Sequence, residues 1–173
     1  MSNQIKGINL EKIGLDSSAI ICLAIDVKNL EYFKKHFCKF DRKFYFSVES
    51  EAEVIGVLIN KYFFNPEDAR ATWKNISEEI ELNLINWGEN TKDKEFFFNE
   101  VKEINNMVAQ SEKNPSLIIG DMDARIISNF YFKGIKKVYT LDKAFIKTCS
   151  ELDIINLNFP KEFIQRMNTR SKK

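Results

Sequence analysis

An apolar run that ends on an aspartate, at residues 13–16, constrains this chain more than any other feature. Residues 13–15 are short, apolar and typical of a buried parallel strand. Two serines then begin a second apolar stretch, residues 19–25, which has the composition and spacing of a helix. Because ligands bind at the carboxyl ends of the strands in open α/β sheets, Asp16 is expected at such an edge. A simpler role for Asp16, taken alone, is to cap the helix that follows it.

Three more acids occupy comparable places further along the chain. Asp142 follows the apolar run 138–141, and Glu53 and Asp123 lie early in helices that begin after other segments. Asp123 stands three and four residues before two isoleucines, which puts it on the buried side of its helix. In a parallel sheet with right-handed crossovers, all of these positions share one edge with Asp16. The sequence therefore predicts a cluster of four carboxylates.

The choice of acid is left open at two of these places. Glu49 and Glu51 precede Glu53 in the same predicted helix, where the helix dipole favours negative charge near the N-terminus. Either could replace Glu53 in the cluster, although Glu53 lies beside the apolar face. Asp121 likewise competes with Asp123, but its position is better suited to the N-cap of the helix.

Carboxylates must carry the chemistry, because the chain has a single histidine, His36, among lysines in a predicted amphipathic helix at residues 30–37. A Ser–His or Cys–His hydrolase would need His36, and a metal site made of several imidazoles is excluded. Four carboxylates in one cleft repel each other unless divalent cations neutralise them. Oxygen ligands without histidine or thiolate favour Mg²⁺ or Mn²⁺, which can orient a water molecule and lower its pKa. The alternative is four unrelated surface acids.

The length of the chain, 173 residues, predicts a single domain over residues 1–173. No apolar run approaches the ~20 residues that span a bilayer, and the first ten residues lack the pattern of a signal peptide. Cys22, Cys38 and Cys149 are unclustered and lack metal-ligand spacing, so they are expected to be buried or free thiols. We therefore expect a soluble, cytoplasmic protein with no membrane partner.

Net charge does not point to a polyanionic partner, since 26 basic and 25 acidic residues give +1. The distribution of charge is less even. Basic residues crowd three segments, which are Lys34, Lys35, Lys39, Arg42 and Lys43; Lys133, Lys136 and Lys137; and a basic tail at about residues 161–173. Such clusters are usually solvated surface, and they matter for function only if they flank an acidic metal site.

The middle of the chain, about residues 65–112, is predicted to be a helical insertion. An Asn-Pro pair at residues 65 and 66 begins the first helix, and an apolar stripe predicts that it continues to Gly88. The stripe consists of Ala69, Trp73, Ile76, Ile80, Leu84 and Trp87. A second helix follows and ends near residues 111–115. The pair carries no recognisable chemistry, and its stripe is expected to pack on the chain's own core, or else on a partner.

Four segments resemble the motifs of PIN domains, in the order in which that family has them. They are residues 14–18 (GLDSS), 52–55 (AEVI), 123–127 (DARII) and 138–145 (VYTLDKAF). The resemblance is to single-domain archaeal and bacterial members, including the toxins of VapC-type toxin–antitoxin pairs. It covers roughly residues 10–60 and 115–158, while the helical middle is longer than in small toxins.

This resemblance implies a three-layer α/β/α fold with a central parallel sheet. It also implies a ribonuclease that depends on Mg²⁺ or Mn²⁺, with Asp16, Glu53, Asp123 and Asp142 as ligands and catalytic acids, and Thr140 as a nearby polar group. Ser17 and Asp121 are further auxiliary candidates. Members of this kind often form homodimers, and those of toxin–antitoxin pairs bind an antitoxin protein.

The function predicted from the sequence is therefore a metal-dependent endoribonuclease. Water would attack an RNA phosphodiester in line and leave 5′-phosphate and 3′-hydroxyl ends, in a toxin or in an RNA-processing nuclease. The alternative is an adaptor that does not hydrolyse RNA and binds RNA or a protein through the helices that carry Trp73 and Trp87.

Overall fold

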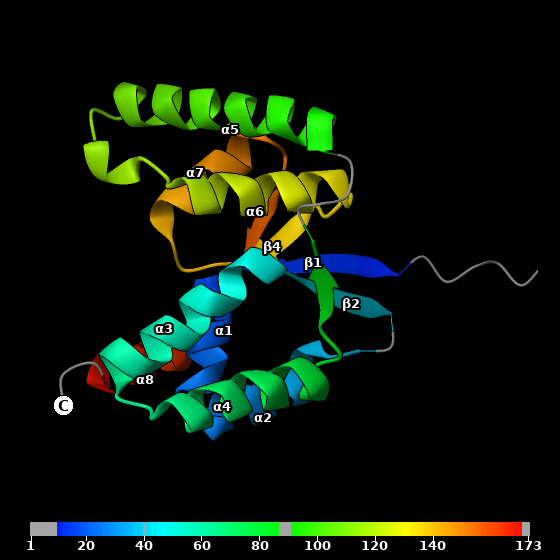
Figure 1. The fold of residues 1–173 in the computed structure, drawn as a ribbon, viewed down its shortest axis with the longest axis vertical. Coiled ribbons are helices and arrows are strands. Elements are labelled where there is room, and N and C mark those ends of the chain that lie inside the picture. Colours follow the sequence, from blue (N-terminus) through cyan, green and yellow to red (C-terminus); the bar gives the residue numbers. More distant parts are fainter. Residues whose placement is uncertain (1–9, 40, 87–90, 171–173) are drawn as a thin grey trace, which may run out of the picture.

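Five parallel strands form the centre of the fold (Figure 1). The computed structural model describes residues 10–39, 41–86 and 91–170. The strands are β1 (Glu11–Leu15), β2 (Arg42–Ser47), β3 (Asn83–Ile85), β4 (Lys137–Tyr139) and β5 (Ile155–Leu157). Their order is β3-β2-β1-β4-β5, and every neighbouring pair is parallel. The chain moves from β1 to one side and later returns to β4 on the other side, so the junction of β1 and β4 is the topological switch point of the sheet.

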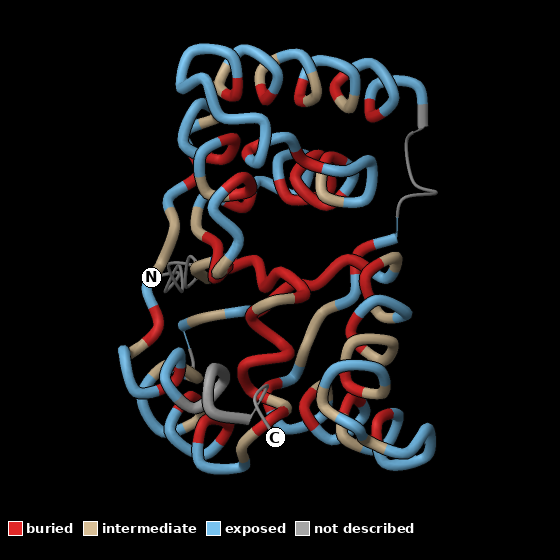
Figure 2. Tube along the Cα trace, turned by 90° about the vertical axis from the view of Figure 1, so that its left-hand side faces the viewer, coloured by how far each residue is buried: buried red, intermediate tan, exposed pale blue. Residues whose placement is uncertain are grey.

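Helices cover both faces of the sheet. One face carries α1 (Ser17–Ala24), α2 (Val27–Phe37), α3 (Glu51–Tyr62), α4 (Pro66–Glu79) and α8 (Lys161–Arg170), and the other carries α5 (Thr91–Ser111), α6 (Asp121–Phe132) and α7 (Lys143–Glu151). Short 3₁₀ turns, η1 (Val48–Ser50) and η2 (Pro115–Leu117), precede α3 and α6. Figure 2 shows buried positions along the sheet and on the helix faces turned toward it. The buried apolar side chains form one cluster on each face. This is the three-layer α/β/α fold that the sequence predicts.

Short polar side chains begin several of these helices directly after a strand or loop. Asp16 caps α1 and accepts a hydrogen bond from the backbone N–H of Ser18. Asn65 caps α4 through the N–H of Asp68, with a proline at the first helical position, as the sequence predicts. Asp142 caps α7. Because one residue separates β1 from α1 and three separate β4 from α7, the caps Asp16 and Asp142 also lie at the carboxyl edge of the sheet.

The prediction of one helix from residue 66 to Gly88 is wrong. Helix α4 ends at Glu79, and the backbone at Glu81 adopts a left-handed conformation, φ 51°, that turns the chain into β3. Leu84 lies in this edge strand and is 50% exposed. The 3–4 apolar spacing therefore continues by coincidence across a turn and a three-residue strand. Trp87 and Gly88 lie outside the described residues.

The first half of the same stripe packs internally, as predicted. Trp73 is 7% exposed, and its ring lies 4.9 Å from that of Phe46 in β2. Ala69 and Ile76 are buried beside it. Helix α4 is therefore part of the protein's own core on this face of the sheet.

The apolar segment that leads into α6 does not join the described sheet. After η2 the backbone is extended at Ile118, and the side chain of Asn105 in α5 supplies the hydrogen bonds that a neighbouring strand would otherwise give to Leu117 and Ile119. Helix α5 therefore packs over the sheet and also hydrogen-bonds the backbone of the segment that enters α6.

The three cysteines are free, as predicted, and two of them are buried. Over residues 10–39, 41–86 and 91–170, no helix is both long enough and apolar enough to cross a membrane.

Two glycines give a stability prediction with opposite signs. A Cβ atom at Gly14 would lie 2.8 Å from the ring of Phe130, which is fully buried. We expect Gly14→Ala to lower the free energy of unfolding by about 1–3 kcal/mol, because the ring has no room to move. Gly56 lies inside α3 with open space around it, so Gly56→Ala should raise stability by about 0.5–1 kcal/mol. Urea unfolding of both variants tests this pair, and a Gly14→Ala variant as stable as wild type would contradict it.

Candidate functional site

The ends of β1 and β4 are joined at Asp16, which is 4% exposed. Its backbone N–H donates to the carbonyl of Tyr139 at 3.1 Å. Its carboxylate Oδ2 accepts from the hydroxyls of Ser18 and Thr140, each at 2.8 Å. The Ser18 hydroxyl in turn accepts from the N–H of Leu141 at 2.9 Å. Asp16 is therefore fixed at the switch point of the sheet, where the sequence places it.

Glu53 is held near Asp16 by a hydrogen bond from Ser17, the residue that follows Asp16. The buried hydroxyl of Ser17 donates to Glu53 Oε2 at 2.7 Å. The other two glutamates of this region are placed differently. Glu49 accepts from Ser47 at the end of β2, and Glu51 is half-buried in the first turn of α3. Of the three, Glu53 is the one whose charge raises the pKa of Asp16.

Asp123 lies in the first turn of α6, where its Oδ2 accepts from the N–H of Gly120 at 3.2 Å. Burial raises its pKa to about 6, with further contributions from the charges of Asp16, Asp142 and Glu53. The other three predicted acids therefore all lie close enough to Asp123 to act on it.

Asp121 lies apart from this cluster. The prediction that it caps α6 is wrong, because Gly120 is the N-cap and Asp121 is the first helical residue. Its exposed side chain accepts from the ammonium of Lys102 in α5 at 2.6 Å, and this hydrogen bond lowers its pKa. Two acids two residues apart on a helix point in different directions, so one of them joins the cluster and the other joins a surface ion pair.

Asp142 and Thr140 complete the site from the β4 side. The hydroxyl of Thr140 accepts from the backbone N–H of Asp142 at 3.1 Å and donates to the carboxylate of Asp16. Asp142 Oδ1 accepts from the N–H of Phe145 at 2.8 Å. Thr140 is buried and Asp142 is exposed. Thr140 thus ties the Asp16 carboxylate to the chain that carries Asp142.

The site carries more negative charge than it can neutralise. Burial raises the pKa of Asp16, opposed by the hydrogen bonds from Ser18, Thr140 and the backbone of Ser17. The N-terminal ends of α1, α3, α6 and α7 lie at this edge, and their dipoles also favour negative charge. These contributions let the acids coexist, but the raised pKa values show that repulsion and desolvation are not fully compensated.

The donor set fits a hard divalent cation, since it consists of carboxylate oxygens alone. In Glu53, Asp123 and Asp142 one oxygen accepts a hydrogen bond, and the other receives none from the residues that the structure describes. Within that part of the chain, however, no three His, Cys, Asp or Glu side chains are gathered closely enough to form a complete cation site. The four acids are thus neighbours that must approach further to coordinate one ion.

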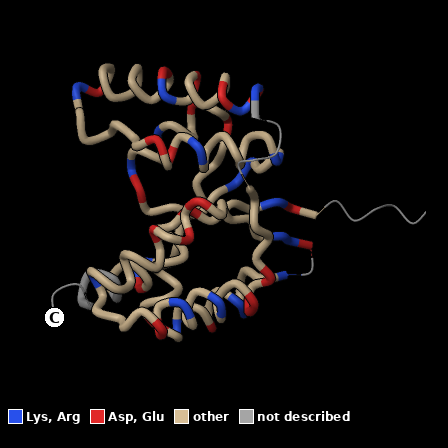
Figure 3. The backbone as a smooth tube through the Cα atoms, viewed as in Figure 1, with Lys and Arg blue, Asp and Glu red and all other residues tan. Residues whose placement is uncertain are grey.

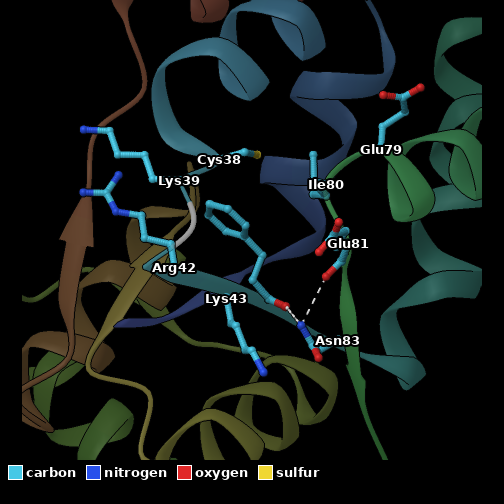
Figure 4. Close-up of a pocket in the computed structure, with 9 residues that line it drawn as sticks. Cys38, Lys39, Arg42, Lys43, Glu79, Ile80, Glu81 and Asn83 are labelled. Carbon is cyan, nitrogen blue, oxygen red and sulfur yellow. Dashed lines mark hydrogen bonds between the residues drawn. The ribbon is translucent and has the colours of Figure 1, made fainter. Parts of the chain in front are cut away.

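A cavity of about 400 Å³ lies elsewhere, at the amino-terminal ends of β2 and β3 (Figure 4). Its walls include Arg42 and Lys43 on one side and Glu81 and Asn83 on the other. The acids follow the carboxyl ends of the strands, so this cavity is not part of the acidic site.

Two of the predicted basic clusters do not flank the acids. Arg42 and Lys137 begin β2 and β4, and both pair with Glu11 at the start of β1, at the opposite end of the sheet. Figure 3 shows Lys and Arg at these strand starts and acidic positions where α3 begins. Sequence proximity alone cannot tell one end of a strand from the other. Lys143, by contrast, is exposed and directly follows Asp142 at the start of α7, whereas Arg125 in α6 lies over the ring of Phe98 and acts on Asp121.

The pKa of Asp123 gives a prediction about pH and stability. The folded state holds the Asp123 proton up to about pH 6, against an ordinary value of 3.8, so the stability linked to this group is present at low pH and is lost as the pH rises between these values. Urea unfolding at about pH 4 and about pH 7.5 should show that Asp123→Asn loses less stability than wild type over this range. Asp121→Asn, whose acid has a lowered pKa, should not reduce this loss. Equal slopes for wild type and Asp123→Asn would contradict the prediction.

Comparison with known proteins supports the fold. No family model matches the sequence, and no curated protein matches it. Among solved structures, VapBC2 from Rickettsia felis, bound to a DNA fragment from its promoter, gives a TM-score of 0.55 at 20% sequence identity, with 86% of this chain and 99% of that chain covered. The chain therefore shares the fold of a chain in that complex.

Proposed function

We propose that this protein is an endoribonuclease that depends on Mg²⁺ or Mn²⁺. The observation that carries the proposal is that Asp16, Glu53 and Asp142 are linked through Ser17 and Thr140 at the switch point of the sheet and that all three charges act on Asp123. Carboxylates whose pKa is raised by burial and by neighbouring negative charge, as in Asp16 and Asp123, form a site that gains stability from a divalent cation. The fold shared with a chain of the VapBC2 complex supports the same class of activity.

Asp16, Asp123 and Asp142 would hold the cation, and Glu53 would serve as a further ligand or orient the attacking water. A cation bound there would lower the pKa of a water molecule and stabilise charge on the phosphate. Ser18 and Thr140 keep the Asp16 carboxylate in one orientation, and Ser17 does the same for Glu53. These hydroxyls reduce the rearrangement needed when the site is loaded.

The substrate proposed is single-stranded RNA. Glu53 and Asp142 are exposed, so the acidic edge is open to a polymer and does not need a small-molecule pocket. Lys143 is exposed directly after Asp142 and would contact a phosphate of the RNA backbone. In-line attack by water would leave 5′-phosphate and 3′-hydroxyl ends. A role of the tail at residues 161–173 in binding RNA stays a prediction.

We also infer an antitoxin protein as a partner, and a homodimer as the assembly. The solved neighbour is itself a complex, VapBC2, bound to DNA from its promoter. This supports a toxin role over a general RNA-processing role. A cytoplasmic location fits that role.

A second function, RNA binding without cleavage, is favoured by one observation. In the described residues the acids do not form a complete cation site. Trp73 itself is buried in the core, so binding through its helix would use the exposed face of α4. Trp87 lies outside the described residues, and this route stays a prediction.

The first test of the proposal measures cleavage. Purified protein with Mn²⁺ or Mg²⁺ should cut single-stranded RNA, and a chelator should stop it. Asp16→Asn and Asp142→Asn should each lower the rate by about 10²–10³-fold or more, because charge stabilisation at the phosphate is lost. Glu51→Gln, in the same helix as Glu53 but outside the cluster, should cut at the wild-type rate. Tight RNA binding without cleavage under either metal would favour the adaptor.

The second test measures thermal stability. Millimolar Mn²⁺ should raise the melting temperature of wild type by mass action. Asp142→Asn should lose most of that increase and should be no less stable than wild type without metal, because one repulsive charge is removed. Glu51→Gln should respond to Mn²⁺ as wild type does. A wild-type melting temperature that Mn²⁺ leaves unchanged would contradict the metal site.

A further inference from the structure

Helix α5 carries two buried polar residues on the face that packs against α6. Lys94 is 5% exposed and Asn105 is 1% exposed. They are separated by about three helical turns, and Phe97 and Val101 lie between them on the same buried stripe. Apolar residues would fill these positions with less desolvation cost, so the polar groups need a reason to be there.

Lys94 begins a chain of hydrogen bonds that ends at the turn before α3. Its ammonium donates to Oδ1 of Asn129 in α6 at 3.2 Å, and also to the carbonyl of Asn86. Nδ2 of Asn129 donates to the hydroxyl of Ser47 at 3.0 Å, and that hydroxyl donates to Glu49 in η1. Ser47 ends β2, next to β1, and is fully buried.

The ammonium sets the direction of this chain. Lysine can only donate, so it fixes the oxygen of the Asn129 amide toward Lys94 and the nitrogen toward Ser47. Ser47 must then accept from Asn129, which leaves its own hydrogen for Glu49. Without the ammonium, the amide of Asn129 could turn over and the order of donors would be lost. Lys94 therefore fixes the turn η1, from which α3 and Glu53 follow.

Asn105 fixes the segment that enters α6 by hydrogen bonds to its backbone. Its Nδ2 donates to the carbonyl of Leu117 at 2.7 Å and to the hydroxyl of Thr148 in α7 at 2.9 Å. Its Oδ1 accepts from the N–H of Ile119 at 3.0 Å. All the hydrogen-bonding groups are buried, and the segment leads directly to Gly120, whose N–H binds Asp123.

We propose that Lys94 and Asn105 are positioning residues that fix the spacing between Glu53 and Asp123. Through these two side chains, α5 connects the two segments that lead to these acids. This inference rests on the proposed function, because Lys94 and Asn105 would position acids of the same proposed site. Removing either polar group would leave the fold in place but let one acid-bearing segment move relative to the other.

The experiment compares Lys94→Met and Asn105→Asp with matched controls on the same helix. Lys102→Met removes a lysine that also bridges α5 to α6, but at the surface through Asp121. Asn106→Asp changes the exposed neighbour of Asn105. Two readouts are used: amide hydrogen exchange without metal, and the Mn²⁺ concentration at the midpoint of metal-induced stabilisation. RNA cleavage at saturating Mn²⁺ is a third.

We expect amide protection at residues 48–54 to fall about tenfold in Lys94→Met, and protection at residues 118–123 to fall similarly in Asn105→Asp. The Mn²⁺ midpoint should rise about 10-fold or more in both, as is typical when groups that orient metal ligands are removed. Cleavage at saturating Mn²⁺ should stay close to wild type. Both control variants should match wild type in all three readouts.

The proposal is overturned if exchange increases only around the substituted residue, or if both variants lose thermal stability while the Mn²⁺ midpoint stays unchanged. Either result would mean that Lys94 and Asn105 only support the core. If wild type itself shows no response to Mn²⁺, the proposed function fails. The hydrogen-exchange data then show separately whether Lys94 and Asn105 order the two segments, because these data need no metal.

Discussion

The burial of Asp16 and the partial burial of Asp123, beside two further carboxylates at the junction of β1 and β4, form the constraint on which the rest of the structure depends. Hydroxyls from Ser17, Ser18 and Thr140 hold the acids in place, and four helix N-termini face the same edge. These contributions do not fully offset burial and the neighbouring charges, because the pKa of Asp123 is still raised to about 6. The protein therefore keeps a region of unfavourable energy at one edge and stabilises it with a well-packed core on both faces of the sheet. Such a division is typical of functional sites rather than of structural ones.

The place of this edge could be predicted because it depends on topology. Each acid follows a strand or begins a helix, and parallel strands bring such positions together, so Asp16 and Asp142 were predictable from apolar runs alone. Other features depend on long-range contacts that leave no local pattern. The edge strand β3 has three residues and continues a helical stripe by coincidence, so it was taken for part of a helix. Nor does the sequence show that the lysines at the strand starts lie away from the acids.

The two polar residues of α5 illustrate a further limit of sequence reasoning. Lys94 and Asn105 are ordinary in composition for an exposed helix, and their helix was predicted to carry no chemistry. Their importance follows from burial and from partners 35 and 12 residues away along the chain. Only tertiary structure shows that a helix outside the motif segments supports the segments that lead to two of the four acids.

The contact between Gly14 and Phe130 has a consequence for how this site could evolve or be redesigned. Phe130 belongs to the helix that carries Asp123, and Gly14 lies two residues before Asp16. The missing side chain at position 14 lets that helix approach the central strand, so a hydrogen atom in place of a methyl group sets how close the helix that carries Asp123 lies to β1. Any larger residue would act as a spacer and move one acid away from another. Selection for a different spacing of the acids could therefore act at a residue that carries no side chain of its own.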